Sequence, residues 1–331
     1  MNQRKIAVLG SNSFSGSDFV DLLLEDDQNE VIGISRSPEK GPLFLPYLRH
    51  TNPRFQFHQL DFNRDMAKIL QAIDDFSPEY IVNFAAQSEV APSWTNPDHW
   101  FQTNTVALAQ LINHLKDKKY LGRYVHISSP EVYGTCEGNV LESAPMNPST
   151  PYAASKAAAD LLLSTYYKNF QFPLVTVRAT NVYGAYQQLF KIIPRSAIYL
   201  KLGKTIQLHG GGHAVKSYIH IRDVSRGELA VMEKGQVGEI YHVSPDRGYA
   251  VREVVQTICE AMNRSFAEST ETVAERLGQD AAYVIDSTKA RTELGWKSEI
   301  SLKDGIAGVI KWVDEFWDEI EKQSLEYIHK P

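Results

Sequence analysis

Residues 8–16, VLGSNSFSG, join a short apolar run to the beginning of an amphipathic segment. Gly10 permits a tight turn at the end of a strand, and Gly16 lets the following helix pack closely against a sheet. The helix that begins near Phe14 then presents its N-terminus to a pyrophosphate. Ser13 stands where the usual glycine fingerprint has its middle glycine. The stretch therefore predicts a dinucleotide-binding strand–turn–helix unit with one departure from the pattern.

Strand and helix patterns alternate through the first half of the chain. The apolar runs that we predict as strands are 5–9, 31–34, 55–57, 80–84, 124–127 and 174–177. Helical spacing of apolar residues occupies several of the intervals, at 14–25, 63–76, 98–118 and 153–170. Repeated βα units predict an α/β fold in which a doubly wound parallel sheet is covered by helices on both faces.

The alternation breaks after residue 178, where loops lengthen and strands become short. Helical patterns at about 189–201, 251–262 and 302–321 are expected here, and 324–331, SLEYIHKP, is expected to form a loose tail. We predict a Rossmann dinucleotide-binding domain over 1–178 and a smaller mixed α/β substrate domain over 179–331. Residues 214–245 are expected to return to the Rossmann sheet.

Composition excludes several classes of function. The chain has 331 residues, of which 43% are hydrophobic, and a net charge of −6, so broad nucleic-acid binding is not expected. No apolar run approaches the roughly 18 residues of a membrane helix, and no signal-peptide pattern begins the sequence. Two cysteines, Cys136 and Cys259, make neither a disulfide framework nor a zinc site. We expect a cytoplasmic protein without a membrane partner or a bound metal.

The end of the second predicted strand reads GISRSPE. An acidic residue usually holds the adenosine ribose 2′-hydroxyl at this position. Here Ser35 occupies it and Arg36 follows. A serine does not repel a 2′-phosphate and an arginine can pair with one, so the sequence favours NADP over NAD. The alternative is that Arg36 is a solvated surface charge.

Two further strand ends carry candidate cofactor contacts. Asp61 and Phe62, in QLDFNRD, follow the third strand, where a carboxylate can meet the adenine amino group. Ala85 and Ala86, in NFAAQS, follow the fourth strand. Their small side chains allow the backbone to approach a cofactor, although small residues also occur beside ordinary crossover helices.

PYAASK places Tyr152 and Lys156 four residues apart at the beginning of a helix, so the two side chains share a face. A tyrosine is a poor base at neutral pH, but a nearby ammonium favours its phenolate form. Ser129 follows the fifth strand and can direct a substrate hydroxyl toward Tyr152. The three residues together predict an oxidation or reduction at a carbon bearing a hydroxyl group. Tyr152 and Lys156 are also expected to contact the cofactor.

The chain resembles the extended short-chain dehydrogenase/reductases that act on nucleotide-diphosphate sugars. The resemblance runs nearly end to end and rests on GSNSFSG, NFAAQS, SSPEVYG, YAASK, RATNVYG, SYIHIRDV and YVIDSTKARTELGW. Within that family the chain is most similar to the 4,6-dehydratases of the dTDP-glucose and GDP-mannose kind. The resemblance implies a tightly bound NAD(P) that is recycled within each turnover. It also implies a homodimer formed through helices at about 98–118 and 152–170.

SSPEVYG decides which chemistry the resemblance implies. In the dehydratases a glutamate at the place of Glu131 removes the C5 proton of a 4-ketosugar, after which water leaves from C6. The dTDP-glucose enzymes have an aspartate before that glutamate, and here Pro130 stands in its place. The GDP-mannose enzymes have a serine there. The resemblance therefore implies that Glu131 serves as base and then as acid.

The resemblance also implies a set of substrate contacts. Gln87 and Ser88 correspond to residues near the sugar ring. The groups expected at the nucleotide diphosphate are Asn181, Lys191, Lys216 and Arg276. Lys216 stands where the family usually has an arginine, and a lysine lacks the two-pronged guanidinium geometry.

Three alternatives stay open at this point. A 4-epimerase or 4-dehydrogenase would use Ser129, Tyr152 and Lys156 and leave Glu131 idle. A decarboxylase of nucleotide-linked uronic acids would also use the glutamate, together with a cation for the C6 carboxylate. A non-catalytic dinucleotide sensor fits least, because such proteins usually lack the Tyr–Lys pair.

Overall fold

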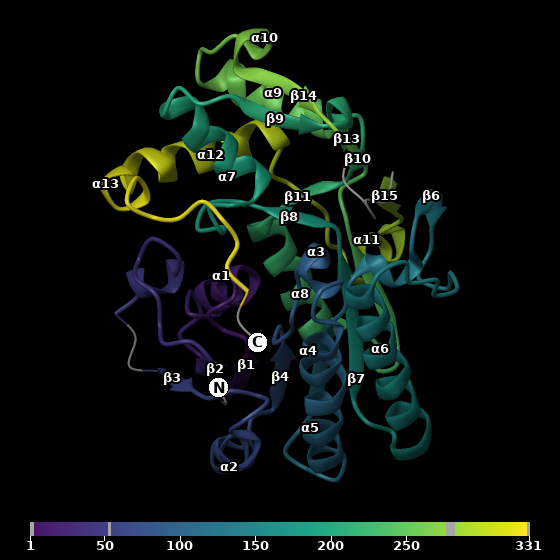
Figure 1. The fold of residues 1–331 in the computed structure, drawn as a ribbon. Coiled ribbons are helices and arrows are strands. Elements are labelled where there is room, and N and C mark those ends of the chain that lie inside the picture. The colour runs from purple at the N-terminus through teal and green to yellow at the C-terminus, as the bar shows by residue number, and fades with distance from the viewer. Residues whose placement is uncertain (1–2, 52–53, 276–281, 330–331) are drawn as a thin grey trace.

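A seven-stranded parallel sheet forms the centre of the molecule (Figure 1). The computed structural model describes residues 3–51, 54–275 and 282–329. In spatial order the strands are β12 (Ile240–Val243), β7 (Leu174–Ala179), β5 (Arg123–Ile127), β4 (Tyr80–Asn83), β1 (Arg4–Leu9), β2 (Asn29–Ser35) and β3 (Phe55–Gln59). The order reverses direction between β1 and β4, where a doubly wound sheet binds its ligand. The α/β fold and the six strands predicted from apolar runs are confirmed.

The sheet is buried on both faces, which is why its strands are nearly continuous apolar runs. In β1, Ile6 and Val8 belong to one core, and Ala7 and Leu9 belong to the core on the opposite face. The helices of the first face are α1 (Phe14–Leu23) and α8 (Ile221–Lys234). Those of the second face are α2 (Met66–Phe76), α5 (Leu108–Leu115) and α6 (Pro151–Phe170).

The helix predicted at 98–118 is divided. It consists of α4 (Pro97–Phe101), a π-helical segment at Gln102–Ala107 and α5. A π-helical turn inside a longer helix is uncommon and is frequently found at functional sites. This turn faces α6, as the adjacent ribbons in Figure 1 also show.

The C-terminal half builds a second core above the carboxyl ends of the parallel strands (Figure 1). Its main helices are α7 (Ile192–Lys201), α9 (Val251–Ala261) and α12 (Leu302–Glu315). The strands outside the central sheet form smaller sheets. β8 (Asn181–Tyr183) pairs with β11 (Tyr218–His220), and β9 (Ile206–His209) pairs with β14 (Thr270–Val273). A further sheet has the order β13 (Tyr249–Ala250), β10 (Val215–Lys216), β15 (Ala282–Ile285) and β6 (Cys136–Val140). The short helices are α3 (Val90–Ser93), α10 (Phe266–Ser269), α11 (Thr288–Leu294) and α13 (Trp317–Ile320), with 3-10 turns at Pro46–Arg49, Pro130–Tyr133 and Gly210–Gly212.

The segment after α13 differs from the loose tail that the sequence suggests. Tyr327 packs edge-on against Phe190, with ring centroids 5.4 Å apart. His329 stacks on Trp100 at 5.1 Å, and its Nε2 lies 2.9 Å from Nδ1 of His99. The segment thus crosses from the C-terminal unit to α4, as the yellow ribbon in Figure 1 shows.

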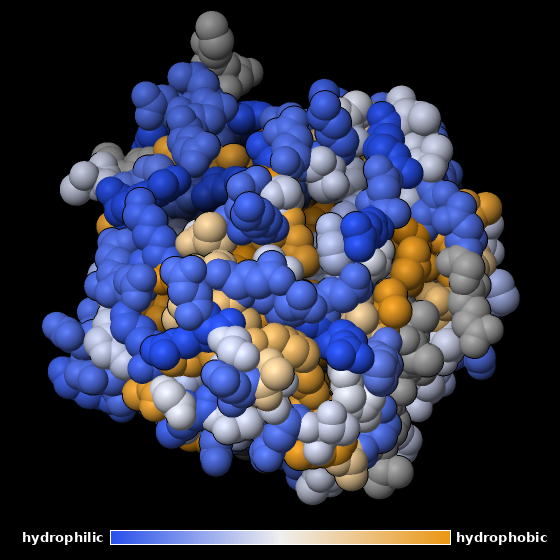
Figure 2. Space-filling model, turned by 90° about the horizontal axis from the view of Figure 1, so that it is seen from above, coloured by the Kyte–Doolittle hydropathy of each residue, from blue (hydrophilic) through white to orange (hydrophobic). Residues whose placement is uncertain are grey.

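Hydrophilic side chains cover most of the face shown in Figure 2, and apolar side chains show between them in separate patches. No helix within the described ranges combines the length and the apolar character that crossing a membrane requires.

Candidate active site

The glycine turn after β1 has the close backbone packing that a pyrophosphate loop needs. Gly10 has φ +84°, and a Cβ there would lie 2.7 Å from the backbone nitrogen of Ala85. A Cβ on Gly16 would lie 2.3 Å from the carbonyl oxygen of Gly10. Ser13 accepts a hydrogen bond from the Gly16 N–H at 3.0 Å and thereby caps α1. The serine at the middle position therefore stabilises the helix whose first turn presents N–H groups to an anion.

The residues at the end of β2 are tied to the same turn. The Ser35 hydroxyl accepts a hydrogen bond from the Asn12 N–H at 2.9 Å and lies 3.4 Å from the Ser11 hydroxyl. Arg36 is half-buried. Burial raises the pKa of Tyr327, and the positive charge of Arg36 opposes that rise, so the arginine lies near the C-terminal segment.

The other two predicted cofactor segments also follow strands of the central sheet. Asp61 accepts a hydrogen bond from the Asn63 N–H at 2.8 Å, and Phe62 is buried beside it. Ala85 is half-buried and Ala86 is exposed. Because β1, β2, β3 and β4 are parallel neighbours, these segments and the glycine turn lie along one edge of the sheet.

The structure brings Ser129, Tyr152 and Lys156 together. Thr150 caps α6 by accepting a hydrogen bond from the Ala153 N–H at 3.1 Å, so Tyr152 lies in the first turn. The Ser129 side chain is near enough to Tyr152 to lower its pKa as a hydrogen-bonding group. Lys156, one helical turn later, donates to the carbonyl oxygen of Ile127 at 2.7 Å. The two hydroxyl groups and the ammonium group predicted to act together thus meet at the carboxyl end of β5.

The electrostatics of this group differ from the sequence argument, which has Lys156 favouring the phenolate. Burial raises the pKa of Tyr152, and the negative charges of Glu131 and Glu89 raise it further, while the hydrogen bond from Ser129 lowers it. Burial also lowers the pKa of Lys156 to about 8, against the opposing effect of Asp160. In the protein alone, desolvation and the nearby carboxylates therefore hold the pKa of Tyr152 above its ordinary value.

A buried polar cluster behind Lys156 was missed in the sequence. Asp160 accepts hydrogen bonds from Arg178 Nη2 at 2.6 Å and from the Ser128 hydroxyl at 2.7 Å, and His126 Nε2 lies 3.3 Å away. Arg178 also donates to Tyr133. Burial acts to raise the pKa of Asp160, yet His126 and Arg178 hold it well below its usual range. The spacing of Lys156 and Asp160, four residues apart on α6, was the available signal.

Asn104 is a second residue that the sequence reading missed. It lies in the π-helical segment and is 3% exposed. Its Oδ1 accepts from the Gln87 N–H at 2.8 Å, and its Nδ2 donates to the Gln87 carbonyl at 3.0 Å and to the Ser155 hydroxyl at 2.9 Å. Asn104 therefore fixes the loop after β4 against α6. Gln87 is buried in this arrangement.

A cavity of about 1170 Å³ lies between the sheet edge and the C-terminal unit. The predicted site residues that line it are Ser88, Glu131, Asn181, Lys191 and Lys216. Arg276 lies outside the described residues. The pocket-lining residues that were not predicted include Glu89, Arg195, Glu326 and Tyr327. Glu89 and Glu131 thus line the cavity at the sheet edge, and the cations Lys191, Arg195 and Lys216 line it on the C-terminal side, together with Glu326.

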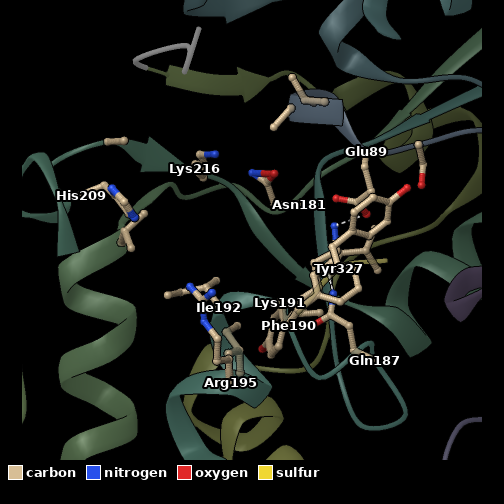
Figure 3. Close-up of a pocket in the computed structure, with 18 of the residues that line it drawn as sticks. Glu89, Asn181, Gln187, Phe190, Lys191, Ile192, Arg195, His209, Lys216 and Tyr327 are labelled. Carbon is tan, nitrogen blue, oxygen red and sulfur yellow. Dashed lines mark hydrogen bonds and ion pairs between the residues drawn. The ribbon is translucent and has the colours of Figure 1, made fainter. Parts of the chain in front are cut away.

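One ion pair joins the two sides of the cavity. Lys191 Nζ donates to Glu89 Oε1 at 2.7 Å, and Figure 3 shows these side chains pointing toward each other beside Tyr327. Lys191 immediately precedes α7, and Glu89 immediately precedes α3. Elsewhere on the wall, the Asn181 Nδ2 is buried and has no hydrogen-bond partner among the described residues. It is a donor suited to a bound anion.

Comparison with known proteins identifies the family. The family model described as GDP-mannose 4,6 dehydratase matches residues 8–309. The chain belongs to this family. Among its curated members, a dTDP-glucose 4,6-dehydratase of Haemophilus influenzae is 29% identical, over 93% of this chain and 97% of the relative. The low-salt glycan biosynthesis protein Agl12 of Haloferax volcanii is 31% identical over the same shares.

Solved structures of similar proteins have the same fold. The dTDP-glucose 4,6-dehydratase DesIV of Streptomyces venezuelae, solved with NAD and TYD bound, superposes with a TM-score of 0.87. It is 31% identical, over 94% of this chain and 97% of that one. The UDP-glucuronic acid 4-epimerase of Bacillus cereus, in complex with its sugar nucleotide and NAD, superposes with a TM-score of 0.84 at 27% identity, over 94% of this chain and 99% of that one. Fold alone therefore does not separate dehydratase from epimerase, and the site residues must.

Proposed function

We propose that this chain is a nucleotide-diphospho-sugar 4,6-dehydratase that produces a 4-keto-6-deoxy sugar nucleotide. The observation that carries the proposal is Glu131, which lines the cavity and acts electrostatically on the hydroxyl of Tyr152. A carboxylate beside Ser129, Tyr152 and Lys156 can act as a base that removes a proton from carbon. A 4-epimerase does not need such a base.

The first step is oxidation at C4. Tyr152 accepts the proton of the C4 hydroxyl group, and Ser129 positions that hydroxyl group. Lys156 is held next to them by its hydrogen bond to the Ile127 carbonyl oxygen. When bound, a nicotinamide dinucleotide supplies a hydride acceptor that takes hydrogen from C4 and later returns it at C6. Ser129 lowers the pKa of Tyr152 and thus favours the phenolate form, which is the form that can accept this proton.

The second step is loss of water. The 4-ketone acidifies the C5 proton, and Glu131 removes it because a carboxylate in hydrogen-bond reach is the required base. The single-carboxylate scheme has Glu131 then deliver the proton to the departing C6 hydroxyl. Pro130, next to it in the short 3-10 turn, has no proton to donate.

The dinucleotide is proposed to lie along the sheet edge. The glycine turn would hold its pyrophosphate, and Asp61 with Phe62 would hold its adenine. The alanines after β4 would lie at its nicotinamide end. We propose NADP over NAD because no acidic side chain stands at Ser35 or Arg36, although relatives were solved with NAD. The nucleotide released on denaturing the purified protein tests this directly. If NAD is released, and Arg36→Ala leaves NADP affinity unchanged, the preference is wrong.

The diphosphate of the substrate is proposed to bind at the cationic wall of the cavity. Asn181, Lys191 and Lys216 line this wall, and Arg276 is proposed to join them. Gln87 and Ser88 are proposed near the sugar, Ser88 from the cavity wall and Gln87 through the backbone that Asn104 holds.

We propose the division into a dinucleotide domain at 1–178 and a sugar-nucleotide domain at 179–331, with 214–245 rejoining the first. β12 and α8 support it, because both belong to the central sheet and its cover. A homodimer through α4–α5 and α6 is proposed as well, in the cytoplasm. Exposed apolar side chains on these helices support the dimer: Phe101, Val106 and Leu161. Sedimentation of the wild type and of Leu161→Glu tests it.

A product assay tests the proposed reaction. The purified protein is incubated with dTDP-, UDP-, GDP- and CDP-hexoses, without added cofactor, and the products are analysed by mass spectrometry. We expect one of these substrates to lose a molecule of water. An isomeric product would instead support a 4-epimerase, and loss of carbon dioxide from a uronic-acid nucleotide would support a decarboxylase.

A further inference from the structure

Loss of the C6 hydroxyl group requires a proton, because hydroxide is a poor leaving group. A group that donates this proton as the C–O bond breaks accelerates such a step. The described residues that line the cavity include three carboxylates, Glu89, Glu131 and Glu326. Glu89 and Glu131 are the two of these whose charges act on Tyr152. Glu89 is therefore a second carboxyl group that faces the same cavity and acts electrostatically on Tyr152.

The fold explains why these two carboxyl groups are neighbours. Glu89 follows β4 and Glu131 follows β5, and the two strands are adjacent and parallel. Their carboxyl ends meet at the same edge of the sheet, above the beginning of α6. The Glu89 side chain is 21% exposed, so it is largely withdrawn from water but open to the cavity. Figure 3 shows it on the cavity wall.

Glu89 forms an ion pair with Lys191, the residue that is proposed to bind the substrate diphosphate. Lys191 holds Glu89 at 2.7 Å across the cavity. If the diphosphate binds Lys191, Glu89 exchanges a cationic neighbour for an anionic one. The Glu89 carboxyl group would then be released from its ion pair and would face the bound substrate.

We propose that Glu89, and not Glu131 as in the single-carboxylate scheme, is the catalytic acid that protonates the departing C6 hydroxyl group, while Glu131 acts as the C5 base. The inference rests on the proposed function, since it assigns a role within that reaction.

The protons balance over one turnover. Glu131 takes the C5 proton, the C5–H electron pair forms the C5–C6 double bond, and the C6–O bond breaks as Glu89 donates its proton to give water. Hydride returns to C6 and Glu131 returns its proton to C5. Tyr152 then carries the proton of the former C4 hydroxyl group and Glu89 lacks one. Exchange of one proton with solvent at each residue restores both.

The test separates oxidation from elimination. Glu89→Gln is assayed with the nucleotide hexose that wild type turns over best, in deuterated water. We expect reduced cofactor to form and deuterium to enter C5 of recovered sugar, while water loss falls by roughly a hundredfold or more. Glu89→Asp, which keeps the acid, should recover part of the rate. Glu260→Gln, an exposed carboxyl change on α9, is the matched control and should match wild type.

A substrate with fluorine in place of the C6 hydroxyl group makes the assignment specific. Fluoride leaves without a donated proton, so Glu89→Gln should process the 6-fluoro substrate at nearly the wild-type rate, whereas Glu131→Gln should not. Near wild-type water loss by Glu89→Gln would overturn the inference. A raised KM with unchanged kcat, or equal defects with both substrates, would overturn it as well. If wild type itself removes water from none of the hexoses, the proposed function fails and not this assignment alone.

Discussion

The polar cluster around Asp160 and the cavity lined by Glu89 and Glu131 both act on the pKa of Tyr152, but their charges are arranged differently. In the cluster, Asp160 and Arg178 are 4% and 1% exposed and form a buried pair. In the cavity, Glu89 and Lys191 are 21% and 36% exposed and reach each other from separate halves of the molecule. The first pair is held by the sheet and α6, whereas the second bridges a cavity.

This difference indicates how the chemistry is divided. A buried cluster held by the Asp160–Arg178 ion pair fixes one geometry, as hydride transfer at C4 requires. A cavity pair can exchange partners when an anionic substrate enters, as proton transfer at C5 and C6 requires. We therefore expect substitutions of the cavity carboxylates to stop elimination selectively. Substitutions in the cluster around Asp160 should instead lower the stability of the folded protein.

Replacing Tyr152 should have the largest effect on activity. Tyr152→Phe leaves no group to accept the C4 hydroxyl proton, so oxidation should fall roughly ten-thousand-fold, the upper range for loss of a general base. Stopped-flow absorbance of reduced cofactor after substrate addition measures it. Absorbance that rises at the wild-type rate would show that another group takes this proton.

Glu131→Gln should break the sequence of steps at a later point. The amide keeps the size of the side chain but removes the base, so reduced cofactor should accumulate while water loss falls by roughly a hundred- to ten-thousand-fold. Deuterium from solvent should largely fail to enter C5. A variant that still incorporates deuterium at the normal rate would place the base elsewhere.

Asp160→Asn tests the buried polar cluster next to Lys156. It leaves the Arg178 charge buried without its partner, which typically costs about 3–5 kcal/mol of unfolding free energy. Because the folded protein holds the pKa of Asp160 below its usual range, the carboxylate stabilises the fold above the ordinary carboxyl pKa. That contribution is lost as the pH falls below this value. Urea unfolding should therefore show a gap between the two proteins that narrows in acid, and a constant gap would contradict the pairing.

Glu228 provides a smaller, contrasting test because it is buried and unpaired. It lies on α8 with neither carboxylate oxygen hydrogen-bonded to a described residue, and burial raises its pKa well above the ordinary value. A raised pKa of this kind stabilises at low pH and costs stability as the pH rises. Relative to Glu228→Gln, wild type should lose about 1.4 kcal/mol of unfolding free energy per pH unit between the ordinary glutamate pKa and the raised pKa of the folded protein. Equal pH dependence of the melting temperatures would show that the site is hydrated.

The sequence predicts the elements that depend on local pattern. The apolar runs gave six of the seven strands of the central sheet, and the spacing of Tyr152 and Lys156 placed both on α6. These features follow from side-chain periodicity, which a single sequence displays. The glycine turn was also predicted from the sequence. The role of Ser13 became clear only in the structure, where its side chain caps α1.

What the sequence could not predict depends on contacts between distant segments. Glu89 and Lys191 are 102 residues apart, and nothing in either local pattern indicates that they pair. The raised pKa of Tyr152 likewise results from burial and from carboxylates on two other loops. The tail looked loose because its stabilising partners, Phe190 and Trp100, lie far away in the chain.

The central claim is that one hydrogen moves from C4 to C6 of the same sugar while water leaves. The most direct measurement is turnover of a nucleotide hexose that carries deuterium at C4, with no added cofactor, followed by NMR of the product. The account predicts a 4-keto-6-deoxy sugar with the deuterium at C6. Deuterium retained at C4 of an isomeric sugar, or lost from the sugar altogether, would contradict it.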